Sequence, residues 1–170
     1  MTTVLKYVQT VTLDAGASGV PAQHNFRANS IYDPDLSGTG GQPMGRDQFE
    51  IIYDHYTVIG AKMKVKFFTA GDYKQNVAMW VGGRLQDAAS SYSNLPYLLE
   101  QPGTKGKMMM TGTYDGRQTN DLTLKYSPKS MFKLGKGSVV GNTRICAQQG
   151  ANPVEDAIFS IIAVQPDGSS

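Results

Sequence analysis

The segment Thr57–Thr69, with the sequence TVIGAKMKVKFFT, carries the clearest strand pattern in this chain of 170 residues. Successive side chains of a β-strand point to opposite faces of its sheet. The apolar residues of the segment therefore share one face and three lysines share the other: Ile59, Ala61, Met63, Val65 and Phe67 against Lys62, Lys64 and Lys66. This alternation predicts a strand that buries one face in a core and presents a row of lysines on the other.

Six further segments show strand patterns of apolar, β-branched and aromatic residues. In the first of them, Val4–Leu13, the residues Leu5, Tyr7, Val11 and Leu13 share one face. The remaining predicted strands are Gln23–Asn29, Val77–Leu85, Lys105–Thr111, Leu122–Tyr126 and Asp156–Val164, and Ser138–Ala147 is the candidate for an eighth.

Two short helices are predicted between these strands. The helix Gln48–His55 is predicted to begin at a capping pair formed by Asp47 and Glu50. The helix Ser93–Gln101 has Pro96 early in the segment, where proline is tolerated. Strands dominate and do not alternate regularly with helices, which favours an antiparallel sandwich over a parallel α/β sheet. No repeat or shift in composition divides the chain. We therefore predict an all-β fold in which residues 1–170 form a single domain.

The long loop Ser30–Gly45 begins with a pattern that is also typical of calcium loops. Asp33, Asp35 and Ser37 occupy alternate positions before a glycine. A calcium loop carries a bidentate glutamate at its twelfth position, but that position is Met44 here. The segment before the loop is predicted to be extended where an EF-hand has a helix, so the loop is not an EF-hand. The pattern fits a turn in which aspartates bond nearby backbone N–H groups. An isolated cation site on these oxygens stays open, and no metal is predicted.

The sequence contains no pattern of an enzyme active site. Neither a G-x-S-x-G elbow nor a G-x-x-x-x-G-K-[ST] phosphate loop occurs. His24 and His55 lie far apart without an HExxH context, and Cys146 is the single cysteine. We predict a non-enzymatic protein without a cofactor.

The charge and hydropathy of the chain give little information on whether it binds nucleic acid, enters a membrane or is secreted. The net charge of +2 is small for a protein that binds nucleic acid through its overall charge. No segment resembles a signal peptide or is long and apolar enough to span a bilayer, so no membrane partner is predicted. A single cysteine fits a reducing compartment.

Several phrases, in order, resemble the capsid proteins of small circular single-stranded DNA viruses that encode their own replication initiator. The shell domains of those proteins are similar to those of tombusvirus-like RNA viruses. The phrases span nearly all of Leu5–Val164 and are KYVQTVTLDAGASG, FRANSIYDPD, GQPMGRDQ, YTVIGAKMKV, LEQPGTK, KYSPKSMF and GANPVEDAIFSIIA.

The resemblance implies a single eight-stranded antiparallel jelly roll with two short helices in its connecting loops. It also implies a capsid protein of the virion that assembles with copies of itself, in the host nucleus or cytoplasm, into an icosahedral shell around single-stranded DNA. In such a shell the long loop is expected to form subunit contacts, and our candidates are Asp33, Asp35, Arg46 and Asp47. An RNA-virus shell domain of the same fold is an alternative.

Members of this family begin with an arginine-rich arm that neutralises the packaged genome, whereas here Met1-Thr2-Thr3 leads directly into the first predicted strand. Either the arm has been removed from this chain or this member packages its genome with little help from one. The lysine row then gains importance, and we predict phosphate contacts at Lys6, Lys62, Lys64 and Lys66. A solvated sheet face is the competing interpretation of the same lysines.

Two other classes remain as alternatives. A carbohydrate-binding jelly roll would place Trp80 or Tyr92, exposed, in a concave groove. A small β-sandwich enzyme has no candidate nucleophile, metal cluster or cofactor loop in this sequence. The resemblance favours the capsid protein over both.

Overall fold

The structure is a computed structural model that describes residues 1–16, 18–69, 77–110, 119–135 and 137–166. Its eight strands are β1 (Ala22–Arg27), β2 (His55–Thr57), β3 (Ala61–Phe68), β4 (Ala78–Gln86), β5 (Lys105–Met110), β6 (Thr119–Tyr126), β7 (Cys146–Gln148) and β8 (Ile158–Val164). Three short helices, α1 (Arg46–Glu50), α2 (Leu95–Glu100) and α3 (Pro128–Met131), lie in the connections. The all-β prediction is confirmed.

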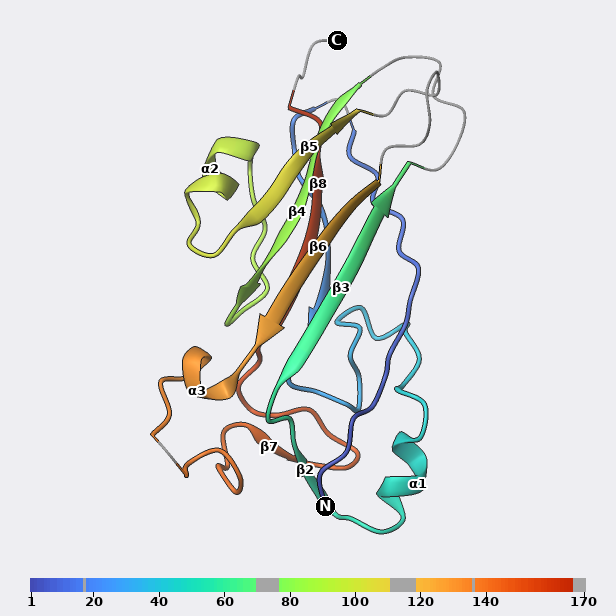
Figure 1. Ribbon diagram of the computed structural model, residues 1–170, viewed down its shortest axis with the longest axis vertical. Coiled ribbons are helices and arrows are strands. Elements are labelled where there is room, and N and C mark those ends of the chain that lie inside the picture. The colour runs from blue at the N-terminus through green and yellow to red at the C-terminus, as the bar shows by residue number, and fades with distance from the viewer. Residues whose placement is uncertain (17, 70–76, 111–118, 136, 167–170) are drawn as a thin grey trace.

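The strands form three antiparallel sheets (Figure 1). The largest has the order β1-β8-β4-β5, and the other two are the pairs β3-β6 and β2-β7. All seven residues of β8 are buried, which explains why this strand is the most apolar segment of the chain. One face of β8 meets the β3-β6 sheet, and the other lies beneath α2.

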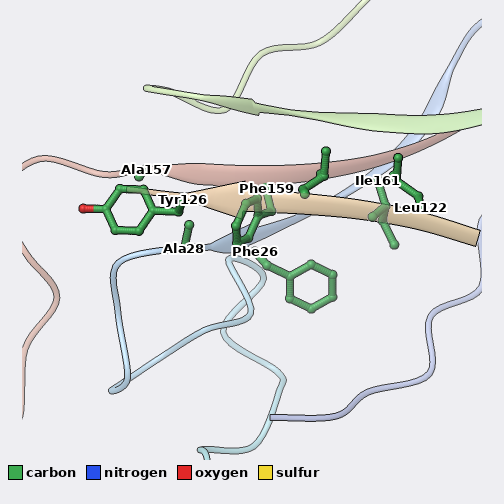
Figure 2. Close-up of a cluster of buried hydrophobic side chains, with 8 residues drawn as sticks. Phe26, Ala28, Leu122, Tyr126, Ala157, Phe159 and Ile161 are labelled. Carbon is green, nitrogen blue, oxygen red and sulfur yellow. The ribbon is translucent and has the colours of Figure 1, made fainter. Parts of the chain in front are cut away.

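The main core lies between the large sheet and β6. Phe26 of β1, Phe159 and Ile161 of β8, and Leu122 and Tyr126 of β6 belong to one buried cluster (Figure 2). A second cluster on the opposite face of the large sheet joins Trp80, Tyr92, Leu98, Ile162 and Val164. Burial removes the Tyr126 hydroxyl from water and raises its pKa to about 12, and among the described residues that hydroxyl has no hydrogen-bond partner.

Two glycines allow the Trp80 indole to lie against its own sheet. A Cβ placed on Gly82 would lie 2.6 Å from Cη2 of Trp80, and one on Gly106 would overlap Cζ2 of the same ring. Only the absence of a side chain at both positions leaves room for the indole.

We expect Gly106→Ala to lower the free energy of unfolding by about 1–3 kcal/mol, because the indole must leave its position or the strands must separate. Urea unfolding followed by Trp80 fluorescence measures the change. Gly150→Ala is the control, since a Cβ at that position meets no atom within 4 Å. Equal stability of the two variants would contradict the packing described for Trp80.

Most predicted strands are confirmed with small shifts in their ends, but two predictions are wrong. Val4–Leu13 is extended without belonging to any sheet, because none of its backbone groups pairs with a described strand. Its burial pattern is nevertheless as predicted, with Leu5, Tyr7, Val11 and Leu13 half-buried. Of Ser138–Ala147, only its last two residues enter a strand, the short β7.

The predicted helix Gln48–His55 is also misplaced. The helix α1 begins at Arg46 and ends at Glu50, and the chain enters β2 at His55 because that segment pairs with β7. Ile52 lies beyond the end of α1 and is 69% exposed. The predicted helix Ser93–Gln101 corresponds to α2, whose cap is the Asn94 side chain accepting a hydrogen bond from the Tyr97 N–H.

Candidate nucleic-acid interface

The lysine row of β3 lies on the outer face of the β3-β6 sheet, as the alternation predicted. Lys62, Lys64 and Lys66 are exposed, whereas Met63, Val65 and Phe67 face the core and are half-buried. Alternate residues of a strand lie about 7 Å apart, so the three ammonium groups can follow a phosphate backbone.

The partner strand β6 adds a fourth lysine that the sequence analysis missed. Directly opposite residues of an antiparallel pair share a face, and Lys62 pairs with Lys125. Lys64 lies opposite Thr123, and Lys66 lies opposite Asp121. The pattern DLTLKY contained the signal, because burial of Leu122, Leu124 and Tyr126 turns Asp121, Thr123 and Lys125 outward.

The net charge of this outer face is therefore positive, with four lysines and one aspartate. Like charges placed directly opposite each other destabilise a sheet. A bound anion would relieve the repulsion between Lys62 and Lys125. This arrangement favours an anion-binding face over a merely solvated one.

Lys6 comes from the N-terminal segment and is exposed. It borders the same open groove as Lys62, Lys64 and Lys66. The structure therefore brings all four predicted phosphate-binding lysines to one region of the surface.

Of the four residues proposed for subunit contacts, Asp35 is fully buried. Its Oδ2 accepts a hydrogen bond of 2.6 Å from Nε2 of Gln9, and its Oδ1 accepts bonds from the Ser37 N–H (2.9 Å) and hydroxyl (2.8 Å). His24 Nε2 lies 3.0 Å from Oδ1. Asp35 thus ties the N-terminal segment and the long loop to β1, and no carboxylate oxygen remains for a neighbouring subunit.

This environment lowers the pKa of Asp35 below its ordinary value of 3.8. Burial alone would raise the pKa, but the hydrogen bonds from Ser37 and Gln9 and the nearby His24 outweigh it. The pKa of Tyr7 is raised by burial and by the charges of Asp35 and Asp33. The hydrogen bond from the Ser37 N–H confirms the turn interpretation of this loop, in place of a calcium loop.

Arg46 is also buried, with 3% of its surface exposed. Its guanidinium donates to the Gln149 carbonyl (2.6 Å), to Glu50 (2.7 Å) and to Gln42 (3.0 Å). It also lies 5.1 Å from the ring centroid of Tyr32. Arg46 therefore attaches α1 to the segment that follows β7. Its side chain is too deeply buried to contact a neighbouring subunit directly.

The other two candidates for subunit contacts lie nearer to solvent. The Asp47 side chain is 77% exposed, and Asp33 contacts Arg27 at 3.2 Å with 26% of its side chain exposed. The contact prediction stays a prediction for Asp33 and Asp47. Asp35 and Arg46 can act on such a contact only through the loop and helix that they hold.

Trp80 and Tyr92, on which the carbohydrate-binding alternative depended, are both buried to 5% exposure. The Trp80 indole packs against Gly82 and Gly106. The Tyr92 hydroxyl donates a hydrogen bond to Gln86 (2.6 Å) and accepts one from Arg84 (3.2 Å). Neither ring is free to stack on a sugar. Within the described ranges, no group of three or more His, Cys, Asp or Glu side chains is placed to hold a metal ion.

No helix in the described part of the chain is long and apolar enough to cross a membrane. Comparisons of this chain with protein-family models, with curated proteins and with solved structures found no match.

Proposed function

We propose that this chain is a non-enzymatic capsid protein that self-assembles into a small icosahedral shell around single-stranded DNA. The phrases that resemble such proteins run through nearly the whole chain, and the all-β architecture agrees with them. The finer proposal is a single jelly roll, which is supported by eight antiparallel strands arranged in facing layers.

The observation that carries the proposal is a group of exposed apolar side chains at α1. Met44, Ile51 and Ile52 are 90%, 87% and 69% exposed, and Tyr53 is 37% exposed. We call these four residues the α1 patch. The helix α1 projects from the side of the molecule (Figure 1). Ile51, Ile52 and Tyr53 are consecutive in the chain, and a contiguous exposed apolar surface marks an interaction site.

Burial of the α1 patch between copies would stabilise their association. An Ile side chain moved fully out of water contributes about 1.5–3 kcal/mol. A closed symmetric assembly repeats each contact many times, so individually weak contacts suffice. The patch therefore fits a subunit that functions as one of many copies.

The α1 patch can be tested by the double substitution Ile51→Ser and Ile52→Ser. We expect the wild-type chain to form shell-sized particles in light scattering and the double variant to remain mostly as free subunits. Leu99→Ser on α2 is the control, because it removes an exposed apolar side chain from the opposite side of the molecule. A wild-type chain that stays monomeric at every salt concentration would contradict the proposed shell.

The lysine face provides the second test. Replacing Lys62, Lys64 and Lys66 by glutamine should reduce the slope of log affinity against log salt for single-stranded DNA by about 2, since each phosphate contact contributes about 0.7. The control is the triple variant in which Lys129, Lys133 and Arg144 become glutamine, which changes the net charge equally at exposed positions outside β3 and β6. Equal slopes for the two variants would show that the lysine face has no special role.

The type of nucleic acid inside the particles distinguishes a capsid protein of a DNA virus from the shell domain of an RNA virus. Absorbance at 260 and 280 nm across the scattering peak detects packaged nucleic acid, and digestion of the extracted material with DNase or RNase identifies it. DNA is the expected result. RNA would favour the shell domain of an RNA virus.

A further inference from the structure

An open groove with a volume of about 1360 Å³ separates the N-terminal segment from β3. Met1–Leu13 forms one wall and β3 forms the other. The groove is also lined by apolar side chains of the large sheet, namely Val81, Met109, Phe159, Ile161 and Ala163. Met63, Val65 and Phe67 of β3 are only half-buried, so the core is incompletely covered along this line.

Both walls have backbone groups available for pairing. In the described part of the chain, β3 pairs with β6 alone, on one of its two edges. Residues 1–13 have the alternation of a strand, but none of their backbone groups bonds to another described residue. An unpaired edge of this kind is a template for another strand.

The two walls run in the same direction. In Figure 1 the N-terminal segment and β3 both rise from the end of the molecule that holds β2 and β7. Every ladder in the described sheets is antiparallel. A single strand placed between the walls and running the opposite way would therefore be antiparallel to both.

The side chains at the groove specify what such a strand should look like. Its inward residues would meet the half-buried apolar side chains of β3, namely Met63, Val65 and Phe67. Its outward residues would lie between Lys6 on one side and the lysine row of β3 on the other. Opposite charges on neighbouring strands stabilise a sheet, so acidic outward residues fit best.

We propose that this groove is a docking site for one extended polypeptide strand of a partner protein, with apolar residues facing the core and acidic residues facing outward. Backbone hydrogen bonds along β3 would give affinity, and the side-chain alternation would give specificity. The N-terminal segment of a second copy does not fit, because its Lys6 would face the lysine row. The inference requires neither a shell nor nucleic acid and so goes beyond the proposed function.

The test uses the full chain and a labelled synthetic peptide of about ten residues in which valine alternates with glutamate and threonine. We expect fluorescence anisotropy to show one peptide bound per chain. Hydrogen exchange should slow at the β3 amides that face away from β6. A peptide with lysine in place of glutamate should bind about tenfold more weakly, and one with two central valines replaced by proline should not bind.

Charge reversal supplies the matched variant. The triple variant Lys62→Glu, Lys64→Glu and Lys66→Glu should prefer the lysine peptide, and if it fails to fold, the glutamine triple variant should lose the preference for glutamate. Equal binding of the proline peptide would show mere charge attraction and overturn the proposal. Absence of binding, or protection of amides outside β3 and the N-terminal segment, would overturn it as well.

Discussion

Replacement of Asp35 by alanine is expected to lower the free energy of unfolding by about 3–5 kcal/mol. The carboxylate is fully buried and accepts hydrogen bonds from Gln9 and Ser37. Its removal deprives Gln9 and Ser37 of their shared acceptor and the nearby His24 imidazole of its carboxylate neighbour, and each hydrogen bond to a charged group contributes about 1.5–3 kcal/mol. Urea unfolding at neutral pH measures the loss.

The Asp35→Asn variant separates the charge from the shape of the side chain. It retains one acceptor oxygen, so we expect it to be more stable than Asp35→Ala and less stable than the wild type. Asp33→Asn is the control, because Asp33 is partly exposed and its contact with Arg27 should contribute about 0–1 kcal/mol. A loss at Asp35 no larger than that at Asp33 would contradict the structural role given to the buried carboxylate.

The stability provided by Asp35 should depend on pH in a defined direction. Its pKa in the folded chain lies below the ordinary value of 3.8 that applies in the unfolded chain. The contribution is therefore fully present above pH 3.8 and is lost as the pH falls through the folded-state pKa. The difference in unfolding free energy between wild type and Asp35→Asn should shrink on acidification, and a difference that grows would contradict the lowered pKa.

The elements that the sequence predicted best are those in which alternation alone decides the outcome. The burial of Met63, Val65 and Phe67 and the exposure of the lysines between them follow from the period of a strand. The same reasoning applied to β6 would have found Lys125. Local pattern thus predicts which face a residue occupies, even before its neighbours are known.

The N-terminal segment shows where this reasoning ends. The alternation in Val4–Leu13 predicted correctly that Leu5, Tyr7, Val11 and Leu13 turn inward. A strand also needs a partner edge about 4.8 Å away, and only the tertiary arrangement decides whether one is present. Here the groove lies between this segment and β3, so the segment is extended but unpaired.

The structural roles of Asp35 and Arg46 were less predictable, because their polar contacts join residues that are distant in the sequence. Gln9 and Asp35 are separated by 26 positions, and Arg46 and Gln149 by 103. Nothing in the local pattern of Asp35 or Arg46 distinguishes a buried charge from a loop residue that contacts a neighbouring subunit. Their burial became clear only in the folded chain.

Replacement of Arg46 by methionine should lower the free energy of unfolding by about 3–5 kcal/mol, although the two side chains are similar in length. The substitution leaves the Gln149 carbonyl and the Gln42 amide oxygen without their donor and removes the ion pair with Glu50. Arg46→Lys should recover only part of the loss, because one ammonium group cannot reproduce the planar fork of the guanidinium. Arg144→Met is the control, since Arg144 is 58% exposed in its pair with Glu155 and should contribute about 0–1 kcal/mol.

Substitution of Arg46 should also loosen α1 and so displace the exposed α1 patch. This helix has five residues and no side-chain cap, so the guanidinium is its main attachment to the segment after β7. In Arg46→Lys, hydrogen exchange should become faster at Phe49–Tyr53 while β8 stays protected, and particle formation should fall with the displaced α1 patch. Unchanged exchange at α1 would mean that the helix is held by other contacts, and normal assembly despite a mobile α1 would remove the α1 patch from the proposed subunit contact.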